Sequence, residues 1–264
     1  MTLTIWDLIL ILVVSLQTTA LAYLRSPRFK ALALTLPFPF TTIALSVGSP
    51  IDATNVAALV VLFGYTQSIR LLHYRLRLPV VLAIALAVAG YAAAGWVLAW
   101  AVPRTEIAFW VITPVVFIIG LALHTRMPIR LEPGYRTTLP LYVKLPVIAC
   151  VVCLLILIKG ALAGFSTLFP MVGVVGAYES RFCLWTFGRQ VPVLMVTLIP
   201  LLVVSHLTQG ALGLGLSLAA GWLVFLIALW VVTGRMWTRW DRLQADADSS
   251  AGAPPNLLPD TARK

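Results

Sequence analysis

Apolar stretches of about 20 residues, the length that a helix needs to cross the hydrocarbon core of a membrane, follow one another along most of this chain. Charged residues, glycine or proline bound each stretch. Of the 264 residues, 61% are hydrophobic and 11% are charged, which excludes a soluble globular protein because most of its surface would be apolar. The sequence therefore predicts an all-α polytopic membrane protein.

About nine stretches have the length and composition of transmembrane helices. The sixth and seventh are the least distinct, because they are short and only Lys159 and Gly160 separate them. The predicted spans are Ile5–Leu24, Ala31–Gly48, Thr54–Tyr74, Leu78–Val102, Ile107–His124, Leu145–Ile158, Ala161–Tyr178, Phe182–Leu207 and Ala211–Val232.

These spans separate the basic residues into two groups, because alternate loops lie on opposite sides of the membrane. Arg189 falls within a span, and 16 of the 19 Lys and Arg residues lie on one side. Only Arg104 and Lys159 lie on the other. Basic loops face the cytoplasm, so we expect a bacterial inner-membrane protein with its N-terminus outside and its C-terminus in the cytoplasm. The basic residues form short clusters, so we expect no nucleic-acid partner.

A Phe-Pro pair recurs in the second and seventh spans. Phe38-Pro39 lies over Phe169-Pro170 when the sequence is shifted by 131 residues (170 − 39). Each pair belongs to a unit of four spans, and the fifth span has no counterpart. An extra crossing inverts the second unit relative to the first, as in many transporters, although chance similarity of apolar segments is the alternative. The predicted parts are a first four-helix repeat (1–103), a linker helix and cytoplasmic loop (104–141), a second repeat (142–234) and a cytoplasmic tail that we expect to be disordered (235–264).

The second unit contains the stretch VKLPVIACVVCLLILIKGALAGFSTLFPMVGVVGAYE, in which a Lys-bearing turn leads into a helix with a Leu-Phe-Pro motif. On this stretch it resembles the GlpM-type small bacterial membrane proteins. The resemblance covers mainly residues 142–232 and only weakly the first unit. The resemblance implies a membrane protein built of units of about four spans. It implies no particular biochemical activity, because none is firmly established for the family. This chain is about twice as long as the members of that family.

The two prolines, Pro39 and Pro170, are predicted to kink or break their helices. A proline lacks an amide donor and collides with the carbonyl four residues earlier, which loses its partner. In lipid, protein or water must bind that carbonyl. We therefore expect two distorted helices that face each other in the interior, or else ordinary packing kinks. Small and hydroxyl-bearing residues near the prolines would assist: Thr35, Pro37, Thr41, Thr42, Gly164, Ser166 and Thr167.

Arg189 lies about 10 Å deep in its predicted span by the helical rise. An arginine at this depth is tolerated mainly when it faces protein or water. We expect it to point into the bundle toward Pro170, with Glu179 or a backbone carbonyl as its partner. The alternative is an arginine that extends to the cytoplasmic interface.

Lys159 and Arg28 are separated by the same 131 residues (159 − 28). In an inverted repeat, these cations lie on opposite sides of the membrane, so we expect them at the two mouths of one pathway. The alternative for Lys159 is an ordinary interfacial anchor.

The sequence contains no convincing catalytic, metal or cofactor motif. Cys150 and Cys153 form a C-x-x-C, but they lie at lipid depth without a residue to activate a thiolate. Ser166 and His206 resemble a protease dyad, yet Thr167 replaces the glycine expected after the serine. We therefore expect no enzyme, cofactor or metal. Two classes remain: a transporter or flippase for an anionic or phosphate-bearing small molecule or lipid, and a non-transporting membrane subunit that supports cell-envelope or lipid metabolism.

Overall fold

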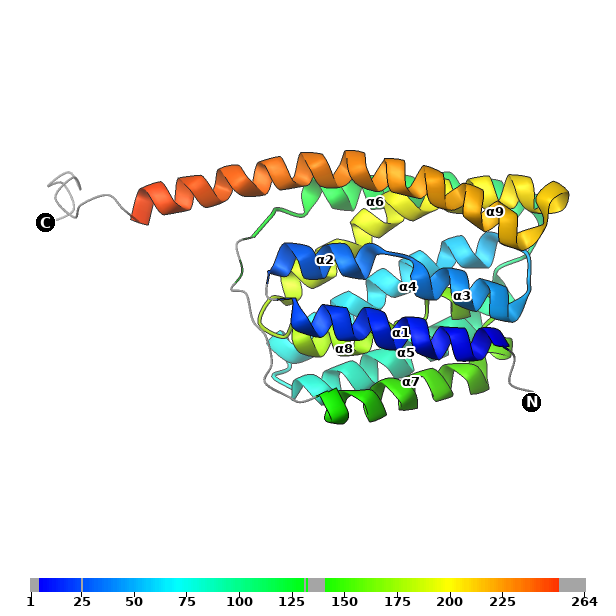
Figure 1. Cartoon of the computed structure of the whole chain (residues 1–264), viewed down its shortest axis with the longest axis horizontal. Coiled ribbons are helices and arrows are strands. Elements are labelled where there is room, and N and C mark those ends of the chain that lie inside the picture. Colours follow the sequence, from blue (N-terminus) through cyan, green and yellow to red (C-terminus); the bar gives the residue numbers. More distant parts are fainter. Residues whose placement is uncertain (1–4, 25, 131, 133–140, 252–264) are drawn as a thin grey trace, which may run out of the picture.

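The computed structural model of this chain is a bundle of helices that lie side by side along one axis (Figure 1). The structure describes residues 5–24, 26–130, 132 and 141–251, and these residues contain no strand. The elements are α1 (Ile5–Tyr23), α2 (Pro27–Thr35), α3 (Phe38–Val47), α4 (Ala53–Arg70), the π-helical turn η1 (Leu71–Arg75), α5 (Val80–Ala101), α6 (Glu106–Arg126), α7 (Leu141–Leu162), the 3-10 helix η2 (Ala163–Leu168), α8 (Met171–Glu179) and α9 (Leu184–Ala251).

Helix α9 consists of two arms that reverse direction at Gly213, where φ is 73°. This left-handed conformation favours glycine. Ser205 Oγ on the first arm donates a hydrogen bond to the carbonyl of Ser217 on the second (3.2 Å). A Cβ added at Gly221 would lie 2.9 Å from Leu201 Cγ, so the arms approach closely. The arms are antiparallel, and the second extends beyond the bundle (Figure 1).

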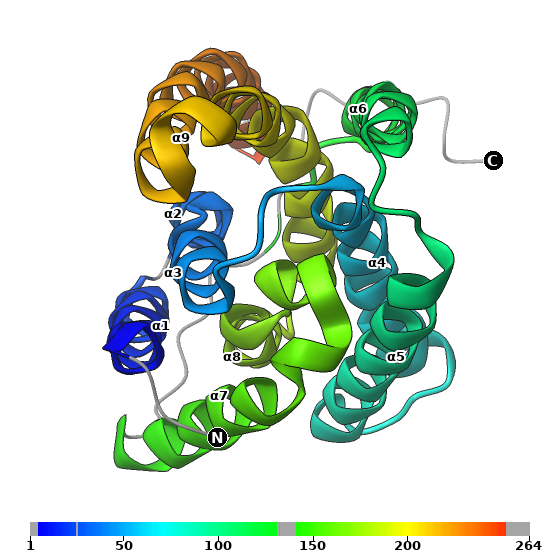
Figure 2. The same ribbon diagram turned by 90° about the vertical axis from the view of Figure 1, so that its right-hand side faces the viewer.

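Elements of the two predicted units run in opposite directions. Helix α1 begins at the right-hand end of Figure 1, whereas α7 begins at the left-hand end. Likewise, α4 begins at the right and the first arm of α9 begins at the left. Viewed along the axis, α8 lies in the interior and contacts α1, α5 and α7, while α6 lies at the periphery against α4 and α9 (Figure 2).

The two ends of the bundle differ in charge. The end at which α2, α5 and α7 begin, here called the basic end, carries most of the described Lys and Arg residues. Arg104 lies at the opposite end, between α5 and α6, and Lys159 lies in the last turn of α7. Described residues at the basic end include Lys30, Arg70, Arg75, Arg77, Arg126, Arg130, Arg181, Arg235, Arg239 and Arg242.

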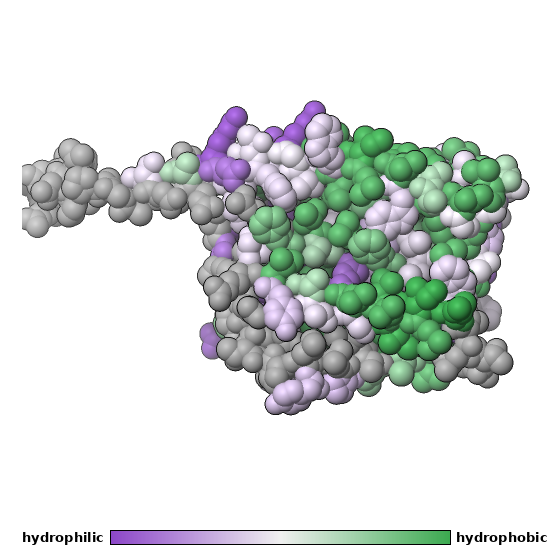
Figure 3. Space-filling view, viewed as in Figure 1, coloured by the Kyte–Doolittle hydropathy of each residue, from purple (hydrophilic) through white to green (hydrophobic). Residues whose placement is uncertain are grey.

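Between its two ends, the bundle exposes apolar side chains. Ile118, Leu223 and Ile227 are 64%, 66% and 64% exposed. In Figure 3, most strongly hydrophilic residues lie toward the left-hand end and hydrophobic residues cover much of the remaining described surface. Such a surface fits a membrane-embedded helical protein. Within the part of the chain that the structure describes, five helical stretches are long and apolar enough to cross a membrane: Phe29–Val47, Ala53–Arg75, Val80–Ala101, Glu106–Arg126 and Leu184–Leu243.

Two observed boundaries differ from the sequence prediction. Helix α7 continues through Lys159 and Gly160, and the chain turns only at Ala163, where φ is 48°. Neither Lys nor a single Gly near a helix end breaks the helix. Helix α9 continues to Ala251, although a disordered tail was predicted from residue 235. Residues 235–251 contain Arg, Leu, Gln and Ala, which favour helix, and no proline; the rest of the predicted tail, 252–264, lies outside the described residues.

Candidate functional site

Two helices are interrupted inside the bundle, each at a residue that precedes proline. Leu36-Pro37 separates α2 from α3, and Phe169-Pro170 separates η2 from α8. Leu36 and Phe169 have φ/ψ of −67°/118° and −56°/131°. Pro37 and Pro170 have −84°/39° and −76°/49°. Because proline disfavours the helical conformation in the residue before it, the two breaks have the same local cause and nearly the same backbone shape.

The backbone geometry pairs Pro170 with Pro37, whereas the sequence alignment pairs it with Pro39. Pro37 and Pro170 are each the N-cap of the helix that follows, which corresponds to a shift of 133 residues (170 − 37). Pro39 lies in the first turn of α3. A proline there loses no helical hydrogen bond, so it does not kink the helix. The predicted distortion of this helix thus occurs at Pro37.

Polar side chains bind the backbone around the first break. Gln17 Nε2, from α1, donates to the carbonyls of Ala33 (2.7 Å) and Leu36 (3.1 Å). Thr41 Oγ1 donates to the carbonyl of Pro37 (3.0 Å). Gln17 thus binds the carbonyl of Ala33, whose helical donor would be Pro37, a residue without an N–H, as an apolar surrounding requires. The Pro37 carbonyl accepts from the Thr41 amide (3.0 Å) as well as from its hydroxyl.

The second break is supported by close packing against α4 and α5. The Gly164 amide donates to Thr54 Oγ1 (3.1 Å), and a Cβ added at Gly164 would lie in severe conflict with that oxygen, at 2.1 Å. The Tyr91 hydroxyl, from α5, donates to the carbonyl of Phe165 (2.8 Å). Glycine is therefore required at position 164 for the backbone of η2 to approach α4.

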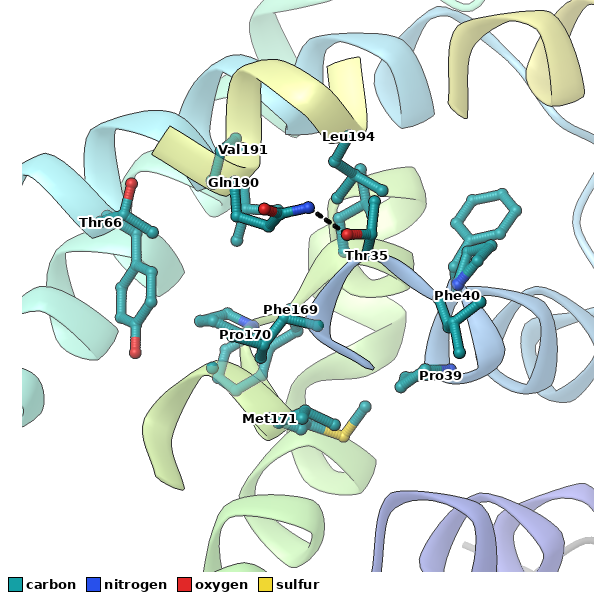
Figure 4. A pocket seen from close by; sticks show the side chains of 18 of the residues that line it. Thr35, Pro39, Phe40, Thr66, Phe169, Pro170, Met171, Gln190, Val191 and Leu194 are labelled. Carbon is teal, nitrogen blue, oxygen red and sulfur yellow. Dashed lines mark hydrogen bonds between the residues drawn. The ribbon is translucent and has the colours of Figure 1, made fainter. Parts of the chain in front are cut away.

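Two hydrogen bonds between side chains connect the predicted units. In each, an amide side chain of one unit donates to a threonine that lies next to the helix break of the other unit. Gln190 Nε2, on α9, donates to Thr35 Oγ1 at the end of α2 (Figure 4). Asn55 Nδ2, on α4, donates to Thr167 Oγ1 in η2 (3.1 Å). Each threonine hydroxyl in turn donates to a carbonyl of its own helix, at 2.8 Å and 2.6 Å. The two breaks are thus connected to each other's units by similar hydrogen bonds.

Both breaks line one central cavity of about 100 Å³ (Figure 4). Its walls come from α1, α2, α3, α4, η2, α8 and α9. The volume is sufficient for several water molecules. No charged side chain lines it among the described residues. The polar side chains in its wall are Gln17, Thr35, Tyr65, Thr66, Thr167 and Gln190.

Two buried polar atoms in the wall of this cavity have no hydrogen-bond partner within the described part of the chain. They are Gln17 Oε1 and the Tyr65 hydroxyl, whose residues are 9% and 3% exposed. Buried polar groups are nearly always hydrogen-bonded in proteins. The amide oxygen accepts hydrogen bonds and the hydroxyl both donates and accepts, so the cavity is suited to water or a polar ligand.

Helices α3 and α8 both begin at the cavity. Pro37, Pro39 and Phe40 of the first, and Pro170 and Met171 of the second, contribute to its wall. The first amides of a helix have no helical acceptor, and the helix dipole places partial positive charge there. Pro39 has no amide and the Met171 amide donates to the carbonyl of Phe169 (2.7 Å), so it is the two helix dipoles, beside neutral side chains, that make the cavity favourable for an anionic group.

Arg189 and Glu179, predicted for the pathway, lie outside the central cavity. Arg189 Nε donates to the carbonyl of Met127 (2.9 Å), and Nη1 lies 3.1 Å from Met236 Sδ. Glu179 and a backbone carbonyl were the two partners predicted for Arg189, and in the structure its partner is a backbone carbonyl. Glu179 is fully buried at the end of α8, and its backbone carbonyl accepts a hydrogen bond from Lys30 Nζ (3.1 Å).

Of the remaining predicted residues, Pro39, Pro170 and Thr167 line the cavity. Thr41 supports the first break without lining the cavity. Ser166 is fully buried and its hydroxyl donates to a backbone carbonyl of η2 (2.7 Å). Arg28, in the first turn of α2, and Lys159, in the last turn of α7, belong to opposite ends of the bundle.

Sequence reasoning did not identify Gln17, Asn55, Tyr65 or Tyr91 as site residues. A signal existed for the two amides, because a side chain of this type inside an apolar span needs a hydrogen-bond partner. The tyrosines gave no such signal, since an aromatic residue in an apolar helix normally packs as a hydrophobic side chain.

Comparison with known protein families, characterised proteins and solved structures gave no significant match. The GlpM-type resemblance therefore stays a prediction, and the functional conclusion rests on the geometry of the site.

Proposed function

We propose that this protein is a membrane transporter or flippase for an anionic or phosphate-bearing small molecule or lipid. The observation that carries the proposal is that two helices, one from each unit, break at a proline and begin again at one cavity, whose mostly apolar wall includes a few polar side chains. Many secondary transporters bind their substrates at interrupted helices whose N-termini point at anionic groups. The substrate's anionic group would occupy the cavity next to the first turns of α3 and α8.

The proposed topology has about nine spans in the bacterial inner membrane, with the N-terminus outside and the C-terminus in the cytoplasm. Each of α1, α4, α5, α6 and α7 would supply one span. The pairs α2–α3 and η2–α8 would each supply one more, and the two arms of α9 the last two. The concentration of basic residues at one end of the bundle supports this orientation.

We further propose that α1–α5 and α7–α9 form an inverted repeat with α6 as the linker helix. Three observations support it: α1 and α7 begin at opposite ends of the bundle, the two breaks share a backbone shape, and an amide–threonine hydrogen bond runs from each unit to the other. Transport would then alternate between openings of the cavity at the two ends.

Each end of the bundle contains contacts that would have to open. At the opposite end from the basic residues, His206 Nδ1 lies 2.7 Å from the carbonyl of Ile51, and His206 Nε2 lies 3.0 Å from Glu106 Oε2. At the basic end, the guanidinium of Arg70 lies 4.8 Å from the centre of the Trp185 ring. These contacts join α9 to α6, to α4 and to the segment before α4, so they are the proposed gates.

Reconstitution of the full chain into proteoliposomes tests the proposal. The probes are fluorescent phosphatidylglycerol, for movement between leaflets, and a radiolabelled small organic phosphate, for uptake. Tyr65→Phe removes an unpartnered hydroxyl at the cavity, so we expect several-fold slower movement with unchanged thermal stability. The matched control is Tyr91→Phe, which removes a hydroxyl that supports the break and lowers stability. If neither probe moves faster than in protein-free liposomes, transport of these classes is contradicted.

A non-transporting membrane subunit is the second candidate, and one observation favours it. No carboxylate lines the cavity among the described residues, so the cavity lacks the acidic group that many carriers use to couple transport to a cation. Such a subunit would support cell-envelope or lipid metabolism through a partner protein. In that case Tyr65→Phe would leave the cellular phenotype of the protein unchanged, and neither probe would move.

A further inference from the structure

A second hollow lies between the end of α6 and the two arms of α9, at the basic end. It consists of adjoining pockets of about 210 Å³ and 400 Å³. None of the residues that line these pockets lines the central cavity. This site, here called the basic pocket, is therefore distinct from the proposed transport cavity. The residues shared by its two parts are His124, Thr125, Ile129, Arg189 and Arg239.

Arg189 brings a buried positive charge to the basic pocket. Its side chain is only 8% exposed, and its hydrogen bonds go to the carbonyl of Met127 and to the sulfur of Met236, a weak acceptor. No described carboxylate pairs with it, and Nη2 has no protein acceptor among the described residues. Burying a cation without a counter-ion is costly. Its placement therefore points to an anion that comes from outside the chain.

Further cations surround Arg189. Arg235 and Arg239 line the inner part of the basic pocket, and Arg239 and Arg242 line the outer part. The described residues supply no carboxylate partner to any of these arginines. His124 adds a buried Nδ1 that has no hydrogen-bond partner within the described ranges. The positive charges of these neighbouring arginines repel one another, and a bound anion would offset that repulsion.

One wall of the inner part is apolar. Leu121, Val196 and Val231 line it, and they belong to the candidate membrane spans Glu106–Arg126 and Leu184–Leu243. Inorganic phosphate would use only the arginines and leave this wall uncovered. An acyl chain would cover the wall, and arginine's planar fork matches the oxygens of a phosphate group. Basic pockets between helices on the cytoplasmic side of membranes bind anionic lipid head groups.

We propose that the basic pocket binds an anionic phospholipid, with Arg189 and Arg239 on its phosphate and the apolar wall against its acyl chain. The lipid would hold α6, the predicted linker helix, against both arms of α9. This site requires only that the bundle lies in a membrane. Lipid binding without any transport would therefore leave this inference intact while contradicting the proposed function.

Binding of short-chain phosphatidylglycerol to the detergent-solubilised full chain tests the site. We expect Arg239→Gln to weaken binding about tenfold, the effect of losing one hydrogen bond to a charged group. Arg189→Gln should weaken it at least as much, and Arg189→Lys less, because lysine keeps the charge without the planar fork. The matched control is Arg75→Gln, which removes an exposed charge at the same end but outside the pocket, and it should leave binding unchanged.

Two further probes identify the source of the phosphate. Inorganic phosphate and short-chain phosphatidylcholine should each bind at least tenfold more weakly than phosphatidylglycerol. Equal binding of inorganic phosphate would overturn the assignment to a lipid. Unchanged phosphatidylglycerol binding in both Arg239→Gln and Arg189→Lys would overturn the site itself. Arg239 is exposed, so its variant should melt at the wild-type temperature without lipid, which separates lost binding from lost folding.

Discussion

The two helix breaks share a backbone shape but are supported in different ways. At Leu36-Pro37, the amide of Gln17 reaches across from α1 and binds two carbonyls. At Phe169-Pro170, the backbone of η2 packs directly on α4, with Gly164 against Thr54. The first break thus depends on the long polar side chain of Gln17. The second depends on glycine at position 164, where any side chain would prevent the close approach to α4.

This difference shows what an interrupted membrane helix requires. The proline before each new helix fixes the local conformation, while the carbonyls that the break frees accept hydrogen bonds from whichever groups the neighbouring helices supply. If the two units arose from one ancestor, the proline would be retained and the supporting residues could diverge. Substitutions at the supports therefore test the comparison, because each support should matter at its own break only.

The largest effect is expected from Gly164→Ala. The new Cβ would lie 2.1 Å from Thr54 Oγ1 and 2.8 Å from the backbone nitrogen of Asn55, and the backbone of α4 cannot easily yield. We expect a loss of about 3 kcal/mol in the free energy of unfolding, measured by thermal or chemical denaturation in detergent. The control is Gly90→Ala, where no atom lies within 4 Å, and it should not destabilise the protein. Equal stabilities of the two variants would contradict the close-packed support.

An intermediate effect is expected from Gln17→Leu. It removes the donor to the carbonyls of Ala33 and Leu36, and we expect a loss of about 2 kcal/mol because buried acceptors are left unpaired. The control is Gln67→Leu, since Gln67 Nε2 is buried without a hydrogen-bond partner among the described residues. That variant should be neutral or more stable in the same denaturation measurement. A neutral Gln17→Leu would show that water supports the first break.

The smallest effect is expected from Tyr91→Phe. It removes the single hydrogen bond to the carbonyl of Phe165 (2.8 Å) without changing the ring, so we expect a loss of about 1 kcal/mol in unfolding free energy. Tyr65→Phe is the matched comparison, because both tyrosines are almost fully buried and their rings lie 6.5 Å apart. A stability loss in Tyr65→Phe as large as in Tyr91→Phe would reveal a partner for the Tyr65 hydroxyl.

The sequence predicts the helices well and the site only in part. Apolar runs bounded by charge locate α4, α5 and α6 to within a few residues, because the bilayer fixes the length of a span. Proline locates the second break, but the first lies at Pro37 and not at the paired Pro39. The sequence alignment paired the two Phe-Pro dipeptides. In the structure, the equivalent prolines are those that cap the helix after each break, Pro37 and Pro170.

Contacts over long sequence distances could not be predicted. Gln17 meets the first break only because α1 packs against α2 and α3. Arg189 was expected to face the segment around Pro170, but its guanidinium lies against Met127 and Met236. Which face of an apolar helix contacts which neighbour depends on packing. The membrane-spanning part of α9 is apolar on nearly all sides, so the pattern of its apolar residues does not indicate which face is buried.

Alternating access requires that the central cavity can be reached from both sides of the membrane, which labelling of an introduced cysteine measures directly. A cysteine replaces Thr66, which lines the cavity and is 3% exposed, in a chain whose Cys150, Cys153 and Cys183 are replaced by alanine. The control cysteine replaces Ile69, which is fully buried on the same helix but does not line the cavity. We expect a small, membrane-impermeant thiol reagent to label Thr66→Cys from either side of proteoliposomes and to leave Ile69→Cys unlabelled. Labelling of Thr66→Cys from one side only, or from neither, would contradict alternating access.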